Sequence, residues 1–538
     1  MFRSSDRPCA AGVRRGEAGF VWGGLSGVAR FTRHPQTDGD SCGRLVRAPE
    51  GLPTNRNWRA TSHGAAGARS APAPQTSRVL MRLPIILLAL AFACAAAEPA
   101  DWIITARYAV TMDPARRIVE DAAVAVRGER IAAVGARSDI TRRFTAKNRL
   151  DRPDAVLLPG LINTHAHAPM SLLRGIAGDL HLQDWLEKYI FPAESRNVTR
   201  DFVQWGTRLA VLEMLLSGTT TYADMYYFED AVAEATRDAG MRAVLGETVI
   251  GFPSPDSKTP ADAIAYAEKF IVRFKDDPLI TPAVAPHALY TNSEETLRAC
   301  RALANRHGVP LIIHLSETKT ENDDMRAKYG ATPTAVLDRW GVFDGRTLAA
   351  HAVWLEDGDF PILAERKVGL AHCPSSNAML ASGVAAVGRW LKLDLAAGLG
   401  TDGPAGSNND FSLFEEMDLA AKLQKVIAGD PLALTARQSL ELATIRGARA
   451  LGMEHEIGSL EAGKRADLIA VSLAEPNSVP LYAVASQVVY AVKGSDVSDV
   501  MVNGRLVVRG RTPLTLDRAQ ILSKAREYGA RIRASLTN

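Results

Sequence analysis

Two histidines stand one residue apart in the sequence Pro-Gly-Leu-Ile-Asn-Thr-His-Ala-His, which occupies positions 159–167. They are His165 and His167. Side chains two positions apart on a strand point to the same face, so both imidazoles can bind one metal ion. Such a pair also occurs in cores that hold no metal, and taken alone it is weak evidence.

Residues of the same chemical kind recur after three later apolar runs. His314 ends one run and Glu317 follows it, His351 ends a second run, and Asp402 follows a third. Four histidines and an aspartate in such positions are hard to explain as packing residues. Imidazoles and a carboxylate suit Zn²⁺ or Fe²⁺ and leave a coordination position for water. We expect one Zn²⁺ ion per chain, with Fe²⁺ as the alternative.

These residues need a scaffold that brings distant strand ends together. Eight apolar runs alternate with helical stretches, which is typical of an α/β protein with a (β/α)₈ TIM barrel. Such barrels place their chemistry at the carboxyl ends of the strands. We therefore predict a metal-dependent TIM barrel over residues 155–445. The eight runs are residues 156–162, 219–225, 242–245, 280–285, 310–314, 347–352, 368–372 and 394–400.

Strand-like segments flank this barrel at both ends of the chain. Residues 98–154 alternate in strand fashion, with a turn at Arg127-Gly128-Glu129-Arg130. A similar pattern follows the barrel, and Asn503-Gly504 there marks a hairpin turn. We predict a small β-sandwich built from both chain ends. Its first part is residues 98–154, and its second part, with a C-terminal helix, is residues 446–538.

The motifs resemble those of the amidohydrolase superfamily, and more closely its methylthioadenosine/S-adenosylhomocysteine deaminase group. The resemblance extends from about residue 102 to about residue 512. Triazine chlorohydrolases are similar to this group, so the scaffold is better determined than the leaving group. The motifs are the segment at 159–167, His-Leu-Ser-Glu-Thr at 314–318, His-Cys-Pro-Ser-Ser-Asn at 372–377, Leu-Gly-Thr-Asp-Gly at 399–403 and Ser-Asn-Asn at 407–409.

The resemblance implies a role for each matching residue. The implied metal ligands are His165, His167, His314 and Asp402, and His351 lies close to the metal-bound water. Glu317 is the implied proton shuttle, and it contacts the substrate together with Asp402. Binuclear members carry a carboxylated lysine after the fourth strand. Residues 279–287 contain no lysine, which favours one metal ion, although a bridging glutamate stays open.

The reaction that follows is hydrolytic deamination of an adenosine-like nucleoside to the inosine analogue and ammonia. Zinc lowers the pKa of its bound water toward about 7, and Asp402 can accept the proton while His351 orients the water. Glu317 can protonate the ring nitrogen and neutralise the charge that develops there. The candidate substrates are 5'-methylthioadenosine, S-adenosylhomocysteine and adenosine.

Two further residues match substrate-binding positions of the family, Glu194 and His287. A glutamate that begins a helix also suits the helix dipole, and this purely structural role stays open for Glu194. The chain departs from the family after the third strand, where members carry an arginine near the substrate and Glu247 stands here. We therefore expect poor recognition of an anionic tail, such as the amino-acid end of S-adenosylhomocysteine.

Composition limits the alternatives. Hydrophobic residues make up 47% of the 538-residue chain and charged residues 23%, which is ordinary for a globular protein. The body carries a net charge of −4 once the twelve arginines and five acids of residues 1–80 are set aside, so nothing favours nucleic-acid binding. The open alternatives are an amidohydrolase or chlorohydrolase acting on another nitrogen heterocycle and a non-catalytic barrel scaffold. Homo-oligomer formation also stays open.

The sequence of the N-terminal region indicates that the protein is exported. Residues 1–80 show no hydrophobic period, and we expect a disordered or untranslated extension. Residues 81–97 have the layout of a secretory signal peptide, with Arg82, an apolar run and Ala95-Ala96-Ala97. The run is shorter than the about 20 residues that span a bilayer. We expect translation from Met81 and a periplasmic or secreted protein, or a cytoplasmic one if the segment is not used.

Overall fold

The computed structural model describes residues 97–536 of the chain. The predictions for residues 1–80, and for the signal peptide up to residue 96, lie outside the described residues. No helix within residues 97–536 is both long and apolar enough to cross a membrane.

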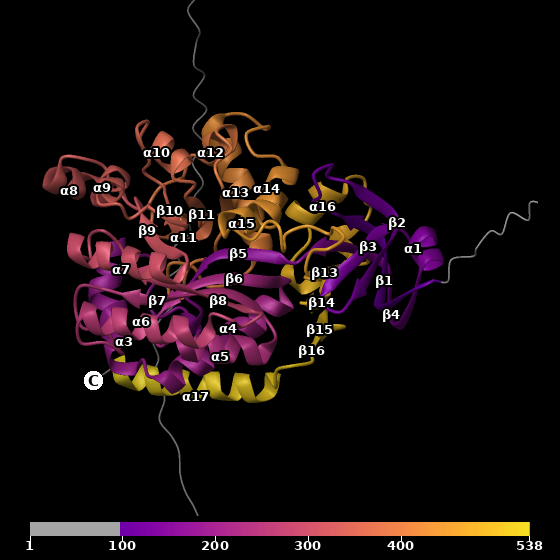
Figure 1. The fold of residues 1–538 in the computed structure, drawn as a ribbon, viewed down its shortest axis with the longest axis horizontal. Helices are drawn as coiled ribbons and strands as arrows, with labels where there is room; N and C mark the ends of the chain where they lie inside the picture. Colours follow the sequence, from indigo (N-terminus) through magenta and orange to yellow (C-terminus); the bar gives the residue numbers. More distant parts are fainter. Residues whose placement is uncertain (1–96, 537–538) are drawn as a thin grey trace, which may run out of the picture. The chain divides into compact units, whose positions relative to one another are not determined.

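Eight parallel strands close into a barrel in the order β10-β11-β12-β5-β6-β7-β8-β9, which confirms the predicted fold class (Figure 1). Every residue of β5, β6 and β7 is buried, as expected for parallel strands covered on both faces. The barrel strands are β5 (Leu161–Ala166), β6 (Thr219–Tyr226), β7 (Arg242–Val249), β8 (Ile280–Pro286), β9 (Leu311–Leu315), β10 (Thr347–His351), β11 (Gly369–His372) and β12 (Ala397–Leu399).

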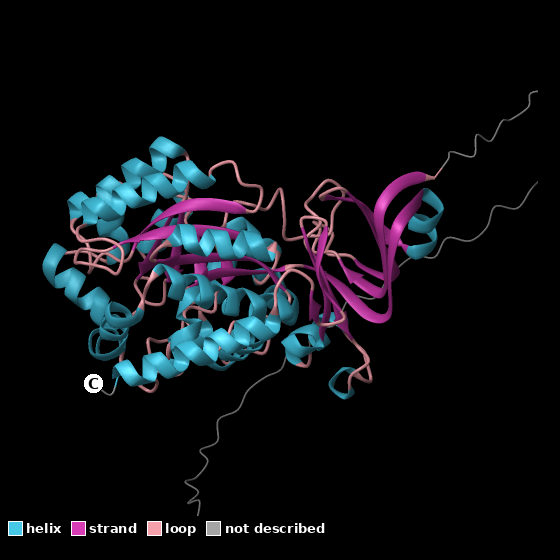
Figure 2. Cartoon of the chain, turned by 90° about the horizontal axis from the view of Figure 1, so that it is seen from below, coloured by secondary structure: helices cyan, strands magenta, loops and turns pink. Residues whose placement is uncertain are grey.

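Helices connect the strands and surround the barrel (Figures 1 and 2). Four short elements lie between β5 and the first long helix: η1 (Ala168–Leu173), α2 (Leu182–Trp185), η2 (Leu186–Ile190) and α3 (Phe191–Asn197). The remaining helices of the barrel are α4 (Arg200–Leu216), α5 (Glu229–Ala239), α6 (Pro260–Phe274), α7 (Glu294–His307), α8 (Lys319–Tyr329), α9 (Pro333–Arg339), α10 (Asp359–Glu365), α11 (Pro374–Met379), α12 (Val387–Lys392), α13 (Leu413–Ala428), α14 (Ala436–Leu442) and α15 (Ile445–Ala450).

Local sequence signals set the ends of several of these helices. The hydroxyls of Thr199, Thr259 and Ser293 accept hydrogen bonds from backbone N–H groups in the first turns of α4, α6 and α7. Gly240 and Gly308 end α5 and α7 in the left-handed region, where glycine has no Cβ penalty. These residues therefore set the ends of α4, α5, α6 and α7 locally.

The first barrel strand begins later than the sequence suggests. We expected it over residues 156–162, but residues 156–159 belong to β4 of the flanking sheet and β5 begins at Leu161. Gly160 alone separates the two strands, and a Cβ on it would lie 2.0 Å from the hydroxyl oxygen of Thr220. The chain therefore turns from one sheet into the other at a position that only glycine fits.

The two chain ends form one continuous sheet in the order β16-β15-β14-β13-β4-β1-β2-β3, in place of two stacked sheets. Side chains from both halves pack into one buried cluster, which includes Ile104, Leu157, Leu468 and Met501, because the sheet curves strongly around it (Figure 2). Its strands are β1 (Glu98–Val110), β2 (Ile118–Arg127), β3 (Arg130–Ala136), β4 (Phe144–Pro159), β13 (Leu468–Ser472), β14 (Val497–Val502), β15 (Arg505–Arg509) and β16 (Thr512–Pro513).

The predicted hairpin turn is present between β14 and β15. Asn503 and Gly504 have φ angles of 51° and 76°, both in the left-handed region that such two-residue turns require. Short helices complete this part of the chain: α1 (Arg137–Arg143), η3 (Pro476–Ser478), α16 (Val484–Tyr490) and η4 (Gly494–Asp496).

The predicted C-terminal helix is α17 (Arg518–Leu536), and it packs on the barrel helices beside α4 (Figure 1). Tyr528 donates a hydrogen bond to Asp201 of α4. A buried ion pair between Arg242 of β7 and Asp467, at 2.8 Å, joins the barrel to the segment that leads into β13. These contacts hold the flanking parts against the barrel without entering its mouth.

Candidate active site

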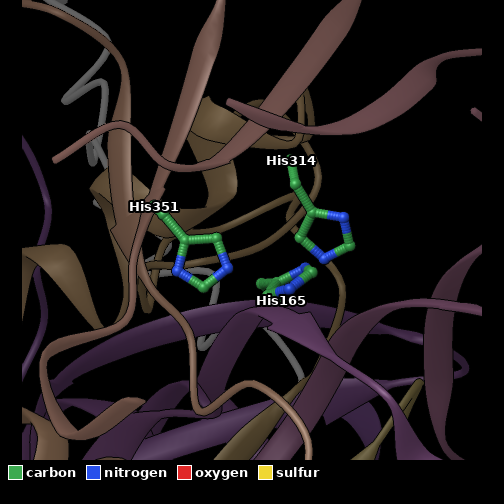
Figure 3. A group of neighbouring side chains, drawn as sticks. All are labelled: His165, His314 and His351. Carbon is green, nitrogen blue, oxygen red and sulfur yellow. The ribbon is translucent and has the colours of Figure 1, made fainter. Parts of the chain in front are cut away.

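The five residues that the sequence singled out meet at the carboxyl end of the barrel. His165 lies on β5, His314 on β9 and His351 on β10. His167 directly follows β5, and Asp402 is the third residue after β12. The ring nitrogens of His165, His314 and His351 point toward one another (Figure 3), and one from each ring lies within 4.8 Å of the others. His165, His167 and Asp402 form a second such group.

The distances within the cluster are short. The Nε2 atoms of His165 and His167 lie 3.4 and 3.2 Å from Oδ1 of Asp402. Nε2 of His167 lies 3.4 Å from Nε2 of His314. All ligand candidates thus converge on one point in the barrel mouth.

The contacts of the Nδ1 atoms determine the tautomers of His167 and His314. Nδ1 of His167 lies 2.7 Å from the carbonyl oxygen of Met225, and Nδ1 of His314 lies 2.8 Å from that of His287. A carbonyl oxygen only accepts, so both Nδ1 atoms carry the proton and a neutral ring has its lone pair on Nε2. In the neutral form of each ring the Nε2 lone pair therefore points into the cluster, and Nε2 of His165 is buried without a hydrogen-bond partner. This donor set fits a divalent metal ion such as zinc.

Electrostatics agrees with a cation at this place. Burial lowers the pKa of His165 to about 4 and that of His314 well below its ordinary value, which keeps both rings in the neutral, metal-binding form. Burial opposes a charge on His167, but the hydrogen bond and the negative charge of Asp402, together with Asp224 and the carbonyl oxygen of Met225, outweigh burial and raise the pKa of His167 to about 9. The carboxylate of Asp402 thus favours positive charge beside it.

Three residues around the site have positive φ angles although none is glycine. They are Ser316 at 48°, His351 at 71° and Asp402 at 62°. Each such conformation costs about 1–3 kcal/mol and persists where the surrounding structure enforces it. Because these residues follow or end strands β9, β10 and β12, the backbone turns there and aims side chains into the barrel mouth.

Glu317 lies beside the cluster, with Oε2 3.8 Å from Nε2 of His351. Burial raises the pKa of its carboxyl, since a charge there loses solvation, and His351 partly opposes the shift. The carboxylate of Glu321 accepts hydrogen bonds from the backbone N–H groups of Ser316 and Glu317 and so holds this turn. A carboxyl group placed and shifted in this way suits proton transfer.

A pocket opens above the cluster, and its free space, including solvent at its mouth, is about 600 Å³. Glu194 and His287 both line it, so the structure brings the two predicted substrate residues to the metal cluster. Tyr226 donates a hydrogen bond of 2.6 Å to Glu194, and burial raises the pKa of that carboxyl to about 7. Nδ1 of His287 lies 3.1 Å from the hydroxyl of Thr291. Their roles toward a substrate stay predictions.

The position of Glu247 differs from the expectation. Side chains alternate along β7, so Thr248 lines the pocket while the Glu247 carboxylate accepts a hydrogen bond from the backbone N–H of Glu229, at the start of α5. Glu247 therefore does not occupy the place of an arginine that would contact a substrate. Among the described residues, no lysine or arginine lines the pocket. The pocket therefore lacks a positively charged side chain because of its whole lining, and not because Glu247 replaces an arginine.

Comparison with known proteins decides the family. The model of the amidohydrolase family matches residues 156–507, which include the entire histidine cluster and Asp402. The chain belongs to the amidohydrolase family.

Amidohydrolases similar to this chain include two bacterial proteins named 5-methylthioadenosine/S-adenosylhomocysteine deaminase. The protein of Syntrophobacter fumaroxidans is 46% identical over 427 residues, which are 79% of this chain and 97% of the relative. The protein of Syntrophus aciditrophicus is 44% identical over 439 residues, 82% of this chain and 99% of the relative.

Solved structures of the family have the same fold. A zinc-bound adenosine deaminase from Xanthomonas campestris matches with a TM-score of 0.80 and 40% identity, covering 81% of this chain and 100% of its own. An atrazine chlorohydrolase from Arthrobacter aurescens in complex with zinc matches with a TM-score of 0.74 and 26% identity, covering 80% of this chain and 100% of its own.

Two side chains that orient residues of the amidohydrolase site were not identified from the sequence, although both lie in the motif at 372–377. The hydroxyl of Ser376 donates a hydrogen bond of 2.7 Å to Oδ2 of Asp402. Oδ1 of Asn377 lies 3.0 Å from Nδ1 of His351. The motif placed these residues after a barrel strand, which was the available signal, but it did not show which ligand each would contact.

Proposed function

We propose that the chain is a zinc-dependent aminohydrolase that deaminates an adenosine-like nucleoside. The observation that carries the proposal is the convergence of four histidines and Asp402 next to the buried carboxyl of Glu317, at the base of a pocket of about 600 Å³. The names of the relatives and the zinc in two similar structures support the same reaction and the same metal.

The chemistry divides between the metal and the protein. When bound, zinc supplies Lewis acidity, which generates a hydroxide nucleophile from water near neutral pH. Ser376 holds one oxygen of Asp402, so the other is oriented to accept a proton from the attacking water. Asn377 holds Nδ1 of His351 and turns Nε2 toward the reacting atoms.

Glu317 completes the proton transfers. Its raised pKa keeps a proton available for the ring nitrogen next to the carbon that is attacked. Water adds to the carbon that bears the amine, the carbon–nitrogen bond breaks, and ammonia leaves as the carbonyl forms. Protons pass from the water through Asp402 and Glu317 to the leaving amine.

The direct test is an assay of purified, zinc-loaded protein with adenosine, methylthioadenosine and S-adenosylhomocysteine. We expect loss of adenine absorbance together with one ammonia per substrate. A chlorinated triazine in parallel separates deamination from dechlorination, because only the latter releases chloride. Chloride release without nucleoside turnover would replace the proposal by a chlorohydrolase, and a purified protein that binds no metal ion would favour the scaffold alternative.

We predict that methylthioadenosine or adenosine is preferred to S-adenosylhomocysteine by at least about tenfold in kcat/KM, which corresponds to about 1.4 kcal/mol. Apolar side chains such as Trp185, Ile190 and Phe191 line the pocket, and a buried carboxylate without a cationic partner is costly. Arg174 is engaged by Glu213 and lies outside the pocket lining.

Comparing kcat/KM for the three nucleosides measures this preference, with Arg174→Ala as the control. The control should leave the order of substrates unchanged. A clear preference of the wild type for S-adenosylhomocysteine that Arg174→Ala removes would show that this arginine reaches the anionic tail.

We also propose that the protein is exported and that its mature N-terminus lies near Glu98. In support, β1 begins at Glu98, which pairs with Phe144 of β4, so the sheet starts where the predicted cleavage site ends. N-terminal sequencing of native protein from fractionated cells tests this. Peptides from residues 1–80 would contradict translation from Met81, and a cytoplasmic form that retains residues 85–93 would contradict export.

A further inference from the structure

A buried carboxyl group lies behind the active site and contacts neither pocket nor ligand cluster. Glu416, on α13, has no exposed surface. Its Oε2 accepts a hydrogen bond of 3.1 Å from the backbone N–H of Ser375, and its Oε1 accepts one of 3.0 Å from the side-chain amide of Asn408. Both partners are donors, and the described residues offer it no ion pair.

The first of these hydrogen bonds caps the N-terminal turn of α11. This short helix begins after Cys373, which makes no side-chain cap, and its first residue, Pro374, has no N–H group. Ser375 therefore carries the first N–H group of the helix, and Oε2 of Glu416 accepts a hydrogen bond from it. The carboxyl group that caps this turn of α11 thus lies 41 residues further along the chain.

The second bond holds the segment around Asp402. Asn408 donates from the same amide nitrogen to the carbonyl oxygen of Thr401, at 2.9 Å, and accepts from the backbone N–H of Asn409. Thr401 directly precedes Asp402. One carboxyl group therefore joins α11 to the loop that carries the catalytic aspartate.

Both joined segments contact residues of the site. Ser376 and Asn377 of α11 hold Oδ2 of Asp402 and Nδ1 of His351, and both side chains are buried. We propose that Glu416 is a positioning residue, which fixes α11 against the 401–410 segment so that Ser376 and Asn377 orient Asp402 and His351. Only the kinetic part of this inference rests on the proposed function.

Glu416→Gln tests this with little change in shape. Glutamine keeps one acceptor oxygen and places an NH₂ group against a donor, so one of the two bonds is lost whichever way it turns. We expect kcat to fall at least about tenfold while KM changes less than about threefold, because Asp402 and His351 act on the attacking water. The visible spectrum of the Co²⁺-loaded protein should shift, with one Co²⁺ still bound per chain.

The matched control is Glu415→Gln, because Glu415 is the preceding residue on α13 and its side chain is exposed. It should leave kcat and the Co²⁺ spectrum unchanged. A double-mutant cycle with Ser376→Ala adds a test of the route. If Glu416 acts through Ser376, the double variant loses clearly less than the product of the two single losses.

Three outcomes would overturn the inference. They are a wild-type kcat and Co²⁺ spectrum in Glu416→Gln, a lower melting temperature with unchanged kcat, and losses that multiply in the double variant. Failure of the proposed function is separate, since it would appear as no nucleoside turnover in the wild type. The Co²⁺ spectra of the wild type and the variants would still decide the role of Glu416 in that case.

Discussion

His314→Ala is expected to remove the metal ion and to reduce turnover to background. Nε2 of His314 faces Nε2 of His167 at 3.4 Å, and its orientation is set by the carbonyl oxygen of His287. Alanine offers no donor, and β9 carries no second ligand candidate that could replace it. The three remaining ligand residues would hold the metal with a much lower affinity, because a preorganised site loses one of its bonds.

Metal analysis after dialysis measures the loss directly, and the nucleoside assay measures turnover on the same sample. His455→Ala is the matched control, since the His455 side chain is 93% exposed and lies far from any ligand candidate in sequence. The control should keep one metal ion per chain and wild-type turnover. Full metal occupancy in His314→Ala would show that His314 is not a ligand.

Glu317→Gln is expected to retain the metal ion and to lower kcat by about 10² or more, which is the usual scale for loss of a general acid. Glutamine preserves the size of the side chain but has no carboxyl proton to donate. The turn that carries it should persist, because Glu321 holds the backbone N–H groups of Ser316 and Glu317 and not the side chain. The defect should therefore be chemical and not structural.

Three readouts separate this role from a loss of folding: metal content, melting temperature and kcat. Glu187→Gln serves as the control, because Glu187 is exposed on η2 while its neighbour Leu186 lines the pocket. It makes the same glutamate-to-glutamine change beside a residue that lines the pocket, outside the metal cluster. Wild-type kcat in Glu317→Gln would end the assignment of Glu317 as the proton shuttle.

The same experiments bear on the similarity to the atrazine chlorohydrolase. A hydroxide nucleophile serves both reactions, but ammonia needs a proton to leave and chloride does not. Release of ammonia or of chloride therefore distinguishes the two reactions, whereas loss of turnover in Glu317→Gln does not, because a proton on the ring nitrogen assists both. The metal ligands cannot make this distinction, because both reactions use them in the same way.

The barrel and its metal cluster could be predicted because their signals are local. His165 and His167 lie on one strand end, and His314 and His351 each end an apolar run, so every ligand candidate is marked by its own neighbours in the chain. A parallel barrel then brings the carboxyl ends of its strands to one face. The rule predicts that these residues lie close together, and the resemblance to the amidohydrolase superfamily implied which of them are metal ligands.

Other properties were decided only by the tertiary structure. The alternation of β7 turns Glu247 away from the pocket, and the flanking strand β4 ends at Pro159, five residues later than the domain boundary drawn from sequence. Ser376 contacts Asp402 across 26 positions, and Glu416 contacts Ser375 across 41. Such partners leave no period or spacing in the sequence, since a hydrogen bond between distant segments depends on how helices pack and not on the residues beside each donor and acceptor.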